Sequence, residues 1–268
     1  MFIALILIFV LIILWLLSLR GRTGHPGLDG LRGWSYAHRG LHGETRPENS
    51  MAAFRAALEA GYGIELDVHL LKDGNLAVMH DSALQRTTGR PGKIENLTTA
   101  QLSQYTLENS TETIPEFRQV LDLFRGKAPM IIELKSEGKN HAALCQAVCA
   151  MLDEYEGVFC LESFDPHCIL WLRRHRPDLI RGQLSENFLV TNFNLPYPAR
   201  FLMTANMVNF LTRPDFIAYK FADRRRIGVR LCRRLYRIQG VAWTLQTRQE
   251  YEEAVKDGWI PIFENFKP

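Results

Sequence analysis

The chain has 268 residues, a length that fits one large domain or two small ones, and we predict one. Hydrophobic residues make up 47% and charged residues 23%, which excludes a disordered or collagen-like chain. The net charge of +3 is too small for a dedicated nucleic-acid-binding protein. The five cysteines are odd in number and lack a zinc-ligand pattern, so they argue against a disulfide scaffold and favour a reducing compartment.

The first 17 residues contain no charged or polar side chain except the indole of Trp15. With Ser18 and Leu19 they are long enough to span a bilayer as a helix, so we expect a transmembrane anchor over residues 1–19. A cleaved signal peptide is the alternative, but no basic residue precedes the apolar run and no small-residue cleavage site follows it. Basic residues flank only the C-terminal side, so the positive-inside rule predicts a single-pass membrane protein whose large domain is cytoplasmic.

Residues 20–33 come next and are rich in glycine, with five glycines and one proline between Gly21 and Gly33. This composition predicts a flexible linker with a root-mean-square reach of about 20 Å. We therefore expect residues 34–268 to form the folded domain.

Short apolar runs alternate with helical patterns from residue 34 onward, which predicts a parallel sheet. The helical patterns are Ser50–Ala60, Pro115–Phe124, Asn140–Tyr155 and Pro166–Arg174. The expected strands are Trp34–His38, Gly63–Leu70, Pro129–Lys135, Gly157–Ser163, Leu179–Leu184, Asp215–Phe221, Gly240–Leu245 and Trp259–Phe263.

Eight such strands predict an α/β fold of the (β/α)₈ TIM barrel type, with an open doubly wound sheet as the alternative. A short return strand, Asn75–His80, follows a turn signal at Lys72-Asp73-Gly74-Asn75. Residues 81–114 lack the strand–helix rhythm, and we interpret them as a small insertion after the second strand.

Polar residues interrupt the apolar strands where a barrel would carry its active site, at the C-terminal strand ends. Glu65 and Asp67 are two residues apart and share one face of a strand, and Glu133 and Lys135 share a face for the same reason. If both faces point into the barrel mouth, three carboxylates converge and require a neutralising cation. Oxygen ligands without cysteine suit Ca²⁺ or Mg²⁺, whereas any single pair alone is also typical of a structural salt bridge.

Two histidines follow strands at the same end of the expected barrel. His38 and His80 each precede or follow a charged residue and fit a general base and a general acid. Arg39 offers a planar pair of donors for a phosphate, and Lys135 offers a point charge. The combination favours phosphoryl over acyl transfer, and the chain has neither a G-x-S-x-G elbow nor a G-x-x-x-x-G-K-[ST] loop.

From about Tyr36 to the C-terminus the chain resembles the glycerophosphodiester phosphodiesterases of the phosphatidylinositol-phospholipase-C-like barrel superfamily. Each motif is weak alone, and their order and spacing carry the resemblance. The matching motifs are His38-Arg39-Gly40, Pro47-Glu48-Asn49-Ser50, Glu65-Leu66-Asp67-Val68, Lys72-Asp73-Gly74, His80-Asp81, Glu133-Leu134-Lys135, Ser163-Phe164-Asp165 and Trp243-Thr244.

The resemblance implies a TIM barrel with a small insertion after the second strand. It also implies one divalent cation, Ca²⁺ or Mg²⁺, held by Glu65, Asp67 and Glu133. His38 and His80 would form the acid–base pair, with His80 as the proton donor to the leaving alcohol.

The same resemblance implies that Arg39 and Lys135 hold the phosphate of the substrate. Glu48 and Asn49 match the Pro-Glu-Asn segment of the family, and we expect them to brace the residues around the ion and the phosphate. Trp243 matches an aromatic residue at the pocket rim, where it would pack on the glycerol carbons, and core packing is its alternative role.

The implied function is a membrane-anchored, metal-dependent hydrolase that cleaves glycerophosphodiesters or lysophospholipids to sn-glycerol 3-phosphate and an alcohol. Its partner would be a small-molecule or lipid phosphodiester. The nucleophile is water or, through a cyclic phosphate, a hydroxyl of the substrate. The alternatives are a phospholipase D-like or C-like enzyme on the same barrel and a non-catalytic phosphodiester-binding protein.

One departure from the family pattern lies at the end of the last strand. The family has a Thr-Asp pair before a proline, whereas this chain has Phe263-Glu264-Asn265. The aspartate is replaced by Asn265, or its role passes to Glu264, and both alternatives affect the edge of the pocket rather than the carboxylate cluster.

Overall fold

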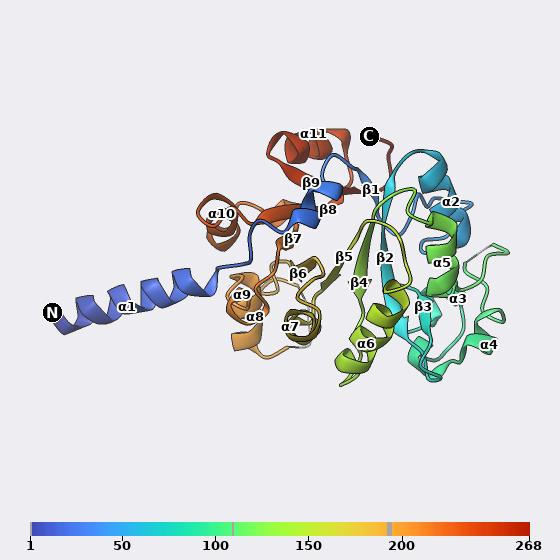
Figure 1. The fold of residues 1–268 in the computed structure, drawn as a ribbon, viewed down its shortest axis with the longest axis horizontal. Helices are drawn as coiled ribbons and strands as arrows, with labels where there is room; N and C mark the ends of the chain where they lie inside the picture. Colours follow the sequence, from blue (N-terminus) through green and yellow to red (C-terminus); the bar gives the residue numbers. More distant parts are fainter. Residues whose placement is uncertain (1, 109, 192–194) are drawn as a thin grey trace.

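The structure is a computed structural model that describes residues 2–108, 110–191 and 195–268. Its centre is a barrel of eight parallel strands with helices packed around the outside (Figure 1). The barrel strands are β1 (Tyr36–Ala37), β2 (Gly63–Leu70), β4 (Met130–Leu134), β5 (Phe159–Ser163), β6 (Arg181–Ser185), β7 (Phe216–Lys220), β8 (Gln239–Leu245) and β9 (Trp259–Phe263).

The strand order closes the sheet on itself. The strands pair in the order β1, β9, β8, β7, β6, β5, β4 and β2, and β1 also pairs with β2. The short strand β3 (Leu76–Val78) runs antiparallel to β2 and forms the expected hairpin. The prediction of a closed (β/α)₈ barrel is therefore confirmed, and the open doubly wound sheet is excluded.

Helices follow the strands and cover the outside of the barrel (Figure 1). The larger ones are α2 (Met51–Glu59), α5 (Phe117–Phe124), α6 (His141–Leu152), α7 (Pro166–His175), α8 (Tyr197–Thr204), α10 (Ile227–Arg234) and α11 (Arg248–Lys256). Two shorter elements, α9 (Asn209–Thr212) and the 3₁₀ turn η3 (Phe221–Asp223), flank β7.

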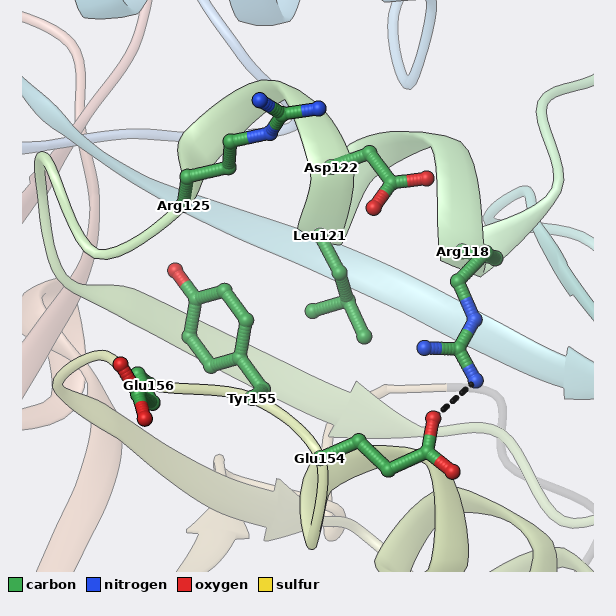
Figure 2. Close-up of a pocket in the computed structure, with 7 residues that line it drawn as sticks. All are labelled: Arg118, Leu121, Asp122, Arg125, Glu154, Tyr155 and Glu156. Atoms are coloured by element: carbon green, nitrogen blue, oxygen red, sulfur yellow. Dashed lines mark hydrogen bonds and ion pairs between the residues drawn. The ribbon is translucent and has the colours of Figure 1, made fainter.

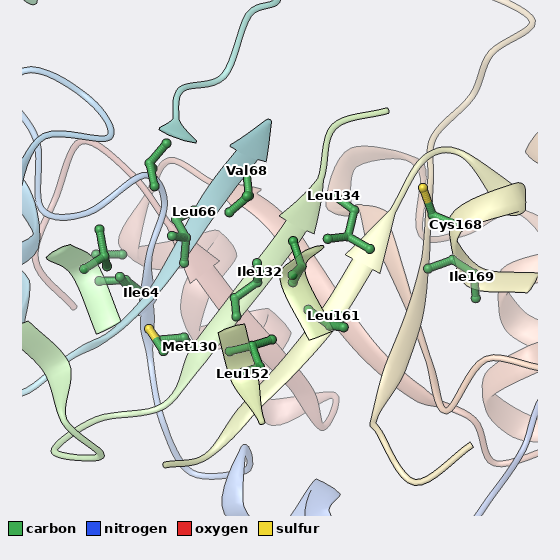
Figure 3. Close-up of a cluster of buried hydrophobic side chains, with 14 of the residues drawn as sticks. Ile64, Leu66, Val68, Met130, Ile132, Leu134, Leu152, Leu161, Cys168 and Ile169 are labelled. Atoms are coloured by element: carbon green, nitrogen blue, oxygen red, sulfur yellow. The ribbon is translucent and has the colours of Figure 1, made fainter. Parts of the chain in front are cut away.

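The two faces of β2 explain how the barrel buries polar side chains. Ile64, Leu66 and Val68 alternate along the strand and pack outward into the cluster between sheet and helices (Figure 3). Glu65 and Asp67 therefore point to the opposite face, toward the barrel axis, and both are buried. Alternation within one strand thus stabilises the fold on one side and places carboxylates inside the barrel mouth on the other.

Residues 20–33, expected to form a flexible linker, instead pack against the barrel. The 3₁₀ turn η1 (Pro26–Gly30) lies within this segment. Leu28 and Leu31 are buried in the cluster inside the barrel, together with Tyr36 and other strand residues. Arg22 fixes the start of the segment, because its guanidinium contacts both carboxylate oxygens of Asp215 at 2.5 Å. These contacts hold the segment in place where glycine content alone predicted a loose connection.

The N-terminal helix α1 (Phe2–Ser18) projects away from the barrel (Figure 1). Among the residues that the structure describes, no helix is long and apolar enough to cross a membrane. The predicted transmembrane anchor over residues 1–19, and the membrane localisation and cytoplasmic orientation that rested on it, are therefore wrong. Met1 itself lies outside the described residues.

The helix ends at Ser18, and the next residue, Leu19, packs into the core of the barrel domain. Leu19 is fully buried, and its carbonyl oxygen accepts hydrogen bonds from the side chains of Asn209 and Cys232. Hydropathy alone measures the apolar run and does not register this anchoring of its last residue.

Between β3 and α5 the chain forms three short elements, α3 (Gln85–Thr88), η2 (Ile94–Asn96) and α4 (Thr99–Leu102). They enclose a small core of their own, which includes Leu84, Ile94 and Leu102. These elements lie within residues 81–114, the expected insertion, of which Asn109 lies outside the described residues. All five cysteines of the chain are buried free thiols.

Candidate active site

Three carboxylates meet at the carboxyl end of the barrel strands. In the parallel register of β2 and β4, Asp67 lies beside Glu133, and Glu65 is on the same face of β2 as Asp67. One oxygen from each of the three side chains lies within 4.8 Å of the other two, and all three residues are buried. The strand pairing thus brings together the residues that the sequence analysis proposed as metal ligands.

Lys135 lies among these carboxylates rather than apart from them. Its ammonium nitrogen is 2.8 Å from Glu133 Oε1 and 3.0 Å from Asp67 Oδ1. Burial alone would raise the pKa of Asp67, but the charges of Lys135, His80 and Arg39 outweigh it and hold that pKa below its usual range. Burial raises the pKa of Glu133 to about 7, although Lys135 opposes the shift.

The donor set fits a hard divalent cation. Burial and the neighbouring charges of Asp67 and Glu133 raise the pKa of Glu65 well above its usual value, so negative charge is in excess at this point. Carboxylate oxygens without a sulfur or imidazole ligand are the donors that Ca²⁺ and Mg²⁺ prefer. Glu65, Asp67 and Glu133 are therefore suited to hold such an ion.

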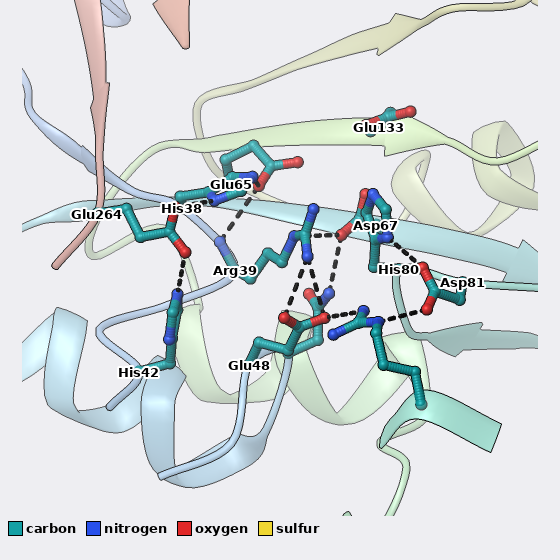
Figure 4. A network of polar contacts seen from close by, with 12 residues as sticks. His38, Arg39, His42, Glu48, Glu65, Asp67, His80, Asp81, Glu133 and Glu264 are labelled. Carbon is teal, nitrogen blue, oxygen red and sulfur yellow. Dashed lines mark hydrogen bonds and ion pairs between the residues drawn. The ribbon is translucent and has the colours of Figure 1, made fainter. Parts of the chain in front are cut away.

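Arg39 (Figure 4) and Asn49 reach the carboxylates from the loop between β1 and α2. Both have left-handed backbone conformations, at φ 53° and 55°, which residues other than glycine rarely adopt. Asn49 Nδ2 donates to Asp67 Oδ2 at 2.8 Å, and Arg39 Nη1 contacts both oxygens of Glu48 at 3.0 and 3.1 Å. Glu48 and Asn49 thus hold Arg39 and Asp67 in position, at the cost of backbone strain.

The turn after β1 requires a glycine at position 40. Its φ is +81°, and a Cβ added there would lie 2.9 Å from the backbone carbon and the Cβ of Ala53. A side chain is therefore excluded by both conformation and space. The turn that carries His38 and Arg39 thus lies directly against α2.

Two imidazoles flank the acidic cluster from different strands. His38 follows β1, and its Nε2 is 3.8 Å from Glu65 Oε2. His80 follows β3, and its Nδ1 is 2.6 Å from Asp81 Oδ1. Burial lowers the pKa of His38, and burial lowers the pKa of His80 to about 4 with the help of Lys135, although Asp67 opposes it. Both rings are therefore neutral at neutral pH in the free chain.

Three further residues at this end were not assigned to the site from the sequence, where Glu264 was considered only as a replacement for the family aspartate. Glu162 on β5 lies beside Glu133 in the strand register and is 1% exposed, and its only signal was a charge inside an apolar strand. Glu264 follows β9 and contacts both His38 and His42. No local sequence pattern links these three positions, because they come together only when the barrel closes.

Arg86, from α3, is the fourth omission. Its Nη2 lies 2.6 Å from Glu48 Oε1, and its Nε lies 2.5 Å from Asp81 Oδ2. Arg86 therefore joins the carboxylate that holds Arg39 to the carboxylate that holds His80. A surface arginine in a short helix carries no signal in the sequence that distinguishes it from its neighbours.

Trp243, expected at the pocket rim, is partly buried on β8. Its ring packs edge-to-face against Phe164 with centroids 5.6 Å apart, and its indole nitrogen is buried without a hydrogen-bond partner. It packs beside the cluster inside the barrel. Glycerol contact and core packing both remain compatible with this place.

A separate hollow of about 270 Å³ lies on the outer wall of the barrel, between α5 and the loop after α6 (Figure 2). Its charged side chains include Arg118 and Glu154, which form an ion pair at 2.9 Å. No histidine lines it, and none of the carboxylates described above does. The chemistry therefore belongs to the carboxyl end of the barrel and not to this hollow.

Comparison with known proteins agrees with this geometry. Residues 38–266 match the family model described as the glycerophosphoryl diester phosphodiesterase family. A glycerophosphodiester phosphodiesterase of Caldanaerobacter subterraneus is 28% identical over 235 residues, which cover 83% of this chain and 89% of that protein. A Bacillus altitudinis protein of the same name is 37% identical over 130 residues, which cover 45% of this chain but only 53% of its own length.

Solved structures show the same fold. A phosphodiesterase of Oleispira antarctica, determined in complex with the product sn-glycerol-3-phosphate, superposes with a TM-score of 0.73. The two chains are 20% identical, and the match covers 90% of this chain and 95% of that one. The fold and the site define a TIM-barrel phosphodiesterase. The chain belongs to the glycerophosphoryl diester phosphodiesterase family and is an enzyme of that class.

Proposed function

We propose that the chain hydrolyses glycerophosphodiesters, releasing sn-glycerol 3-phosphate and an alcohol, in a reaction that depends on a divalent cation. The observation that carries the proposal is the meeting of three buried carboxylates with two imidazoles at one end of the barrel. A binding protein without catalysis has no need of an acid–base pair beside its ligand. The product named in the Oleispira antarctica complex supports the choice of substrate class. We assign the catalysis to residues 34–268, with residues 81–114 as an insertion.

Glu65, Asp67 and Glu133 would hold the cation, which when bound supplies positive charge against the phosphoryl oxygens. Arg39 adds its guanidinium beside Asp67, where two contacts with Glu48 hold it. Lys135 neutralises Asp67 and Glu133 and lies close enough to contact the same phosphate. Trp243 packs on the glycerol carbons at the rim.

The two histidines move the protons. His38 is neutral because burial lowers its pKa, so it accepts the proton of the attacking hydroxyl, of water or of the substrate, as oxygen bonds to phosphorus. His80 donates a proton to the oxygen of the leaving alcohol as the bond between that oxygen and phosphorus breaks. Asp81 contacts His80 Nδ1 at 2.6 Å, and with the substrate anion it favours the protonated ring in the complex.

Replacing the proton donor tests this assignment. His80→Ala should lower turnover by about 10²–10⁴-fold, because the leaving alcohol then departs without a proton. Glycerophosphocholine and glycerophosphoethanolamine are suitable substrates, with products identified by phosphorus NMR in the presence of Mg²⁺ or Ca²⁺ and after chelation.

The outcomes separate the candidate functions. Glycerol 3-phosphate as the final product, lost on chelation, supports the proposal, whereas a stable cyclic phosphate or ceramide phosphate indicates a phospholipase-like enzyme. A fully active His80→Ala variant with an unchanged circular dichroism spectrum would exclude His80 as the acid. Absence of turnover with every phosphodiester would indicate a binding protein.

A further inference from the structure

A second group of potential metal ligands lies at the edge of the acidic cluster. It consists of His38, His42 and Glu264, which come from the end of β1, the loop after it and the end of β9 (Figure 4). One ligand atom from each residue lies within 4.8 Å of the other two. His38 thus presents its two ring nitrogens to two different groups, with Nε2 toward Glu65 and Nδ1 toward Glu264.

The distances within this group match those of a tetrahedral metal site. Glu264 Oε2 is 3.4 Å from His38 Nδ1, and Glu264 Oε1 is 3.1 Å from His42 Nε2. Ligand bonds of about 2.0–2.1 Å at tetrahedral angles separate neighbouring ligand atoms by about 3.3 Å. The two distances to Glu264 therefore suit neighbouring ligands of one ion, and the third pair of ligand atoms lies within 4.8 Å.

The two nitrogens are buried yet lack hydrogen bonds. His38 Nδ1 and His42 Nε2 are each shielded from solvent and make no hydrogen bond among the described residues, although both are in ion-pair contact with Glu264. Buried polar atoms are normally satisfied, so this pair calls for an explanation. A cation between the three side chains would satisfy both nitrogens and the carboxylate at once.

The donor types distinguish this group from the carboxylate cluster. Two imidazoles and one carboxylate are the ligands of catalytic zinc sites, and imidazole nitrogen also suits cobalt and nickel. The three carboxylates around Asp67 suit Ca²⁺ or Mg²⁺ instead. The two groups are adjacent but prefer ions of different chemistry.

We propose that His38, His42 and Glu264 form a second cation site that takes a transition-metal ion of the zinc type, separate from the carboxylate cluster. The ion lies on the Nδ1 side of His38, so the neutral ring keeps its proton on Nε2, which faces Glu65. His38 therefore cannot act as the base while this second site is occupied. The inference rests on the geometry of these three side chains and holds whatever diester the enzyme cleaves.

Co²⁺ is the probe for this site, because its visible absorption reports nitrogen ligands and its site preference resembles that of Zn²⁺. The full chain is first saturated with Mg²⁺ to fill the carboxylate cluster and is then titrated with Co²⁺, with bound metal measured by equilibrium dialysis. We expect one Co²⁺ per chain to remain bound in excess Mg²⁺, with absorption bands of a nitrogen-containing site that Zn²⁺ abolishes.

The decisive variant is His42→Asn, which should weaken Co²⁺ binding by about tenfold or more. His167→Asn is the matched control. His167 Nδ1 is 2.8 Å from Asp165 Oδ1, so this substitution also removes a histidine that is paired with a carboxylate. No third potential ligand lies beside that pair in the described part of the chain. This control should bind Co²⁺ as the parent chain does.

Two results would overturn the proposal. One is displacement of all Co²⁺ by Mg²⁺, which would mean that the carboxylate cluster is the only site. The other is equal retention of Co²⁺ by the parent chain and by His42→Asn. Should His42→Asn not fold, Glu264→Gln provides the same comparison, and a rise in melting temperature with Zn²⁺ in the parent chain but not in Glu264→Gln is then the expected result.

Discussion

At the scale of single residues, the site is governed by the burial of like charges. Glu65, Asp67, Glu133 and Glu162 lie close together inside the barrel mouth, and burial together with their mutual repulsion raises the pKa of Glu65 and of Glu162. Lys135 and Arg39 offset only part of this charge. The cluster is therefore poised to exchange protons for a cation.

The pKa of Glu133, raised to about 7 by burial, predicts a pH-dependent cation affinity. A carboxylate ligand must lose its proton to bind metal, so below pH about 7 the ion competes with that proton. Affinity for Mg²⁺, measured by calorimetry, should weaken by about tenfold for each pH unit below this value.

Glu133→Gln is the control for this dependence, because it removes the titrating group. Its affinity is weaker throughout, and its slope against pH should be smaller by about one proton. An Mg²⁺ affinity of the parent chain that stays constant from pH about 7 down to about 5 would contradict the assignment of the raised pKa to a cation ligand.

At the scale of elements, the short helix α3 reaches back to the barrel through one side chain. Arg86 contacts Glu48, which holds Arg39, and Asp81, which holds His80. The insertion therefore links the groups that we propose for phosphate binding and for proton donation.

Arg86→Gln should accordingly lower kcat by between about 10- and 100-fold, with a smaller change in KM, because the groups that Arg86 orients act mainly during bond breaking. The melting temperature should hardly change, since the Arg86 side chain is 47% exposed. Arg90→Gln is the control, because Arg90 belongs to the same insertion but stacks on Tyr105 instead. Equal kcat values for Arg86→Gln and Arg90→Gln would show that the contacts of Arg86 with Glu48 and Asp81 are not needed for catalysis.

At the scale of the whole molecule, the closed barrel depends on tight contacts between its strands. Gly182 on β6 is paired with Phe216 on β7, and a Cβ added at Gly182 would lie 2.1 Å from two atoms of the Phe216 ring. The ring fills the barrel interior only because residue 182 has no side chain.

Gly182→Ala should therefore destabilise the fold by about 1–3 kcal/mol, because the extra methyl group overpacks the interior. Urea unfolding followed by circular dichroism measures the effect. Gly43→Ala is the control, since nothing lies within 4 Å of an added Cβ there, and its stability should stay within about 0.5 kcal/mol of the parent chain. Similar midpoints for both variants would contradict this account of the interior.

The strands were predictable because their chemistry alternates along the chain. β2 and β9 have the predicted bounds, since their outward residues are apolar and their ends are marked by polar residues or turns. The same alternation predicted that Glu65 and Asp67 share a face, and register then placed Glu133 beside Asp67. This much of the site follows from local pattern and the geometry of parallel strands.

The sequence-based predictions that failed concerned contacts between segments that are far apart in the chain. The length of the apolar run gave no sign that Leu19 is buried against the barrel, where its carbonyl oxygen accepts hydrogen bonds from Asn209 and Cys232. The group formed by His42 and Glu264 was missed because the first and last strands meet only when the barrel closes. Such contacts have no periodic signature in one sequence.

The closure of the barrel through β1 has a consequence for heat inactivation. β1 has only two residues, and it alone joins β2 to β9. The seam between the two ends of the sheet is thus its most weakly hydrogen-bonded part, and His38 and Arg39 follow it directly. Local fraying there separates an imidazole and a guanidinium from their carboxylates while the remaining seven strands stay paired, so catalytic lifetime on warming is limited by this seam before the barrel as a whole melts.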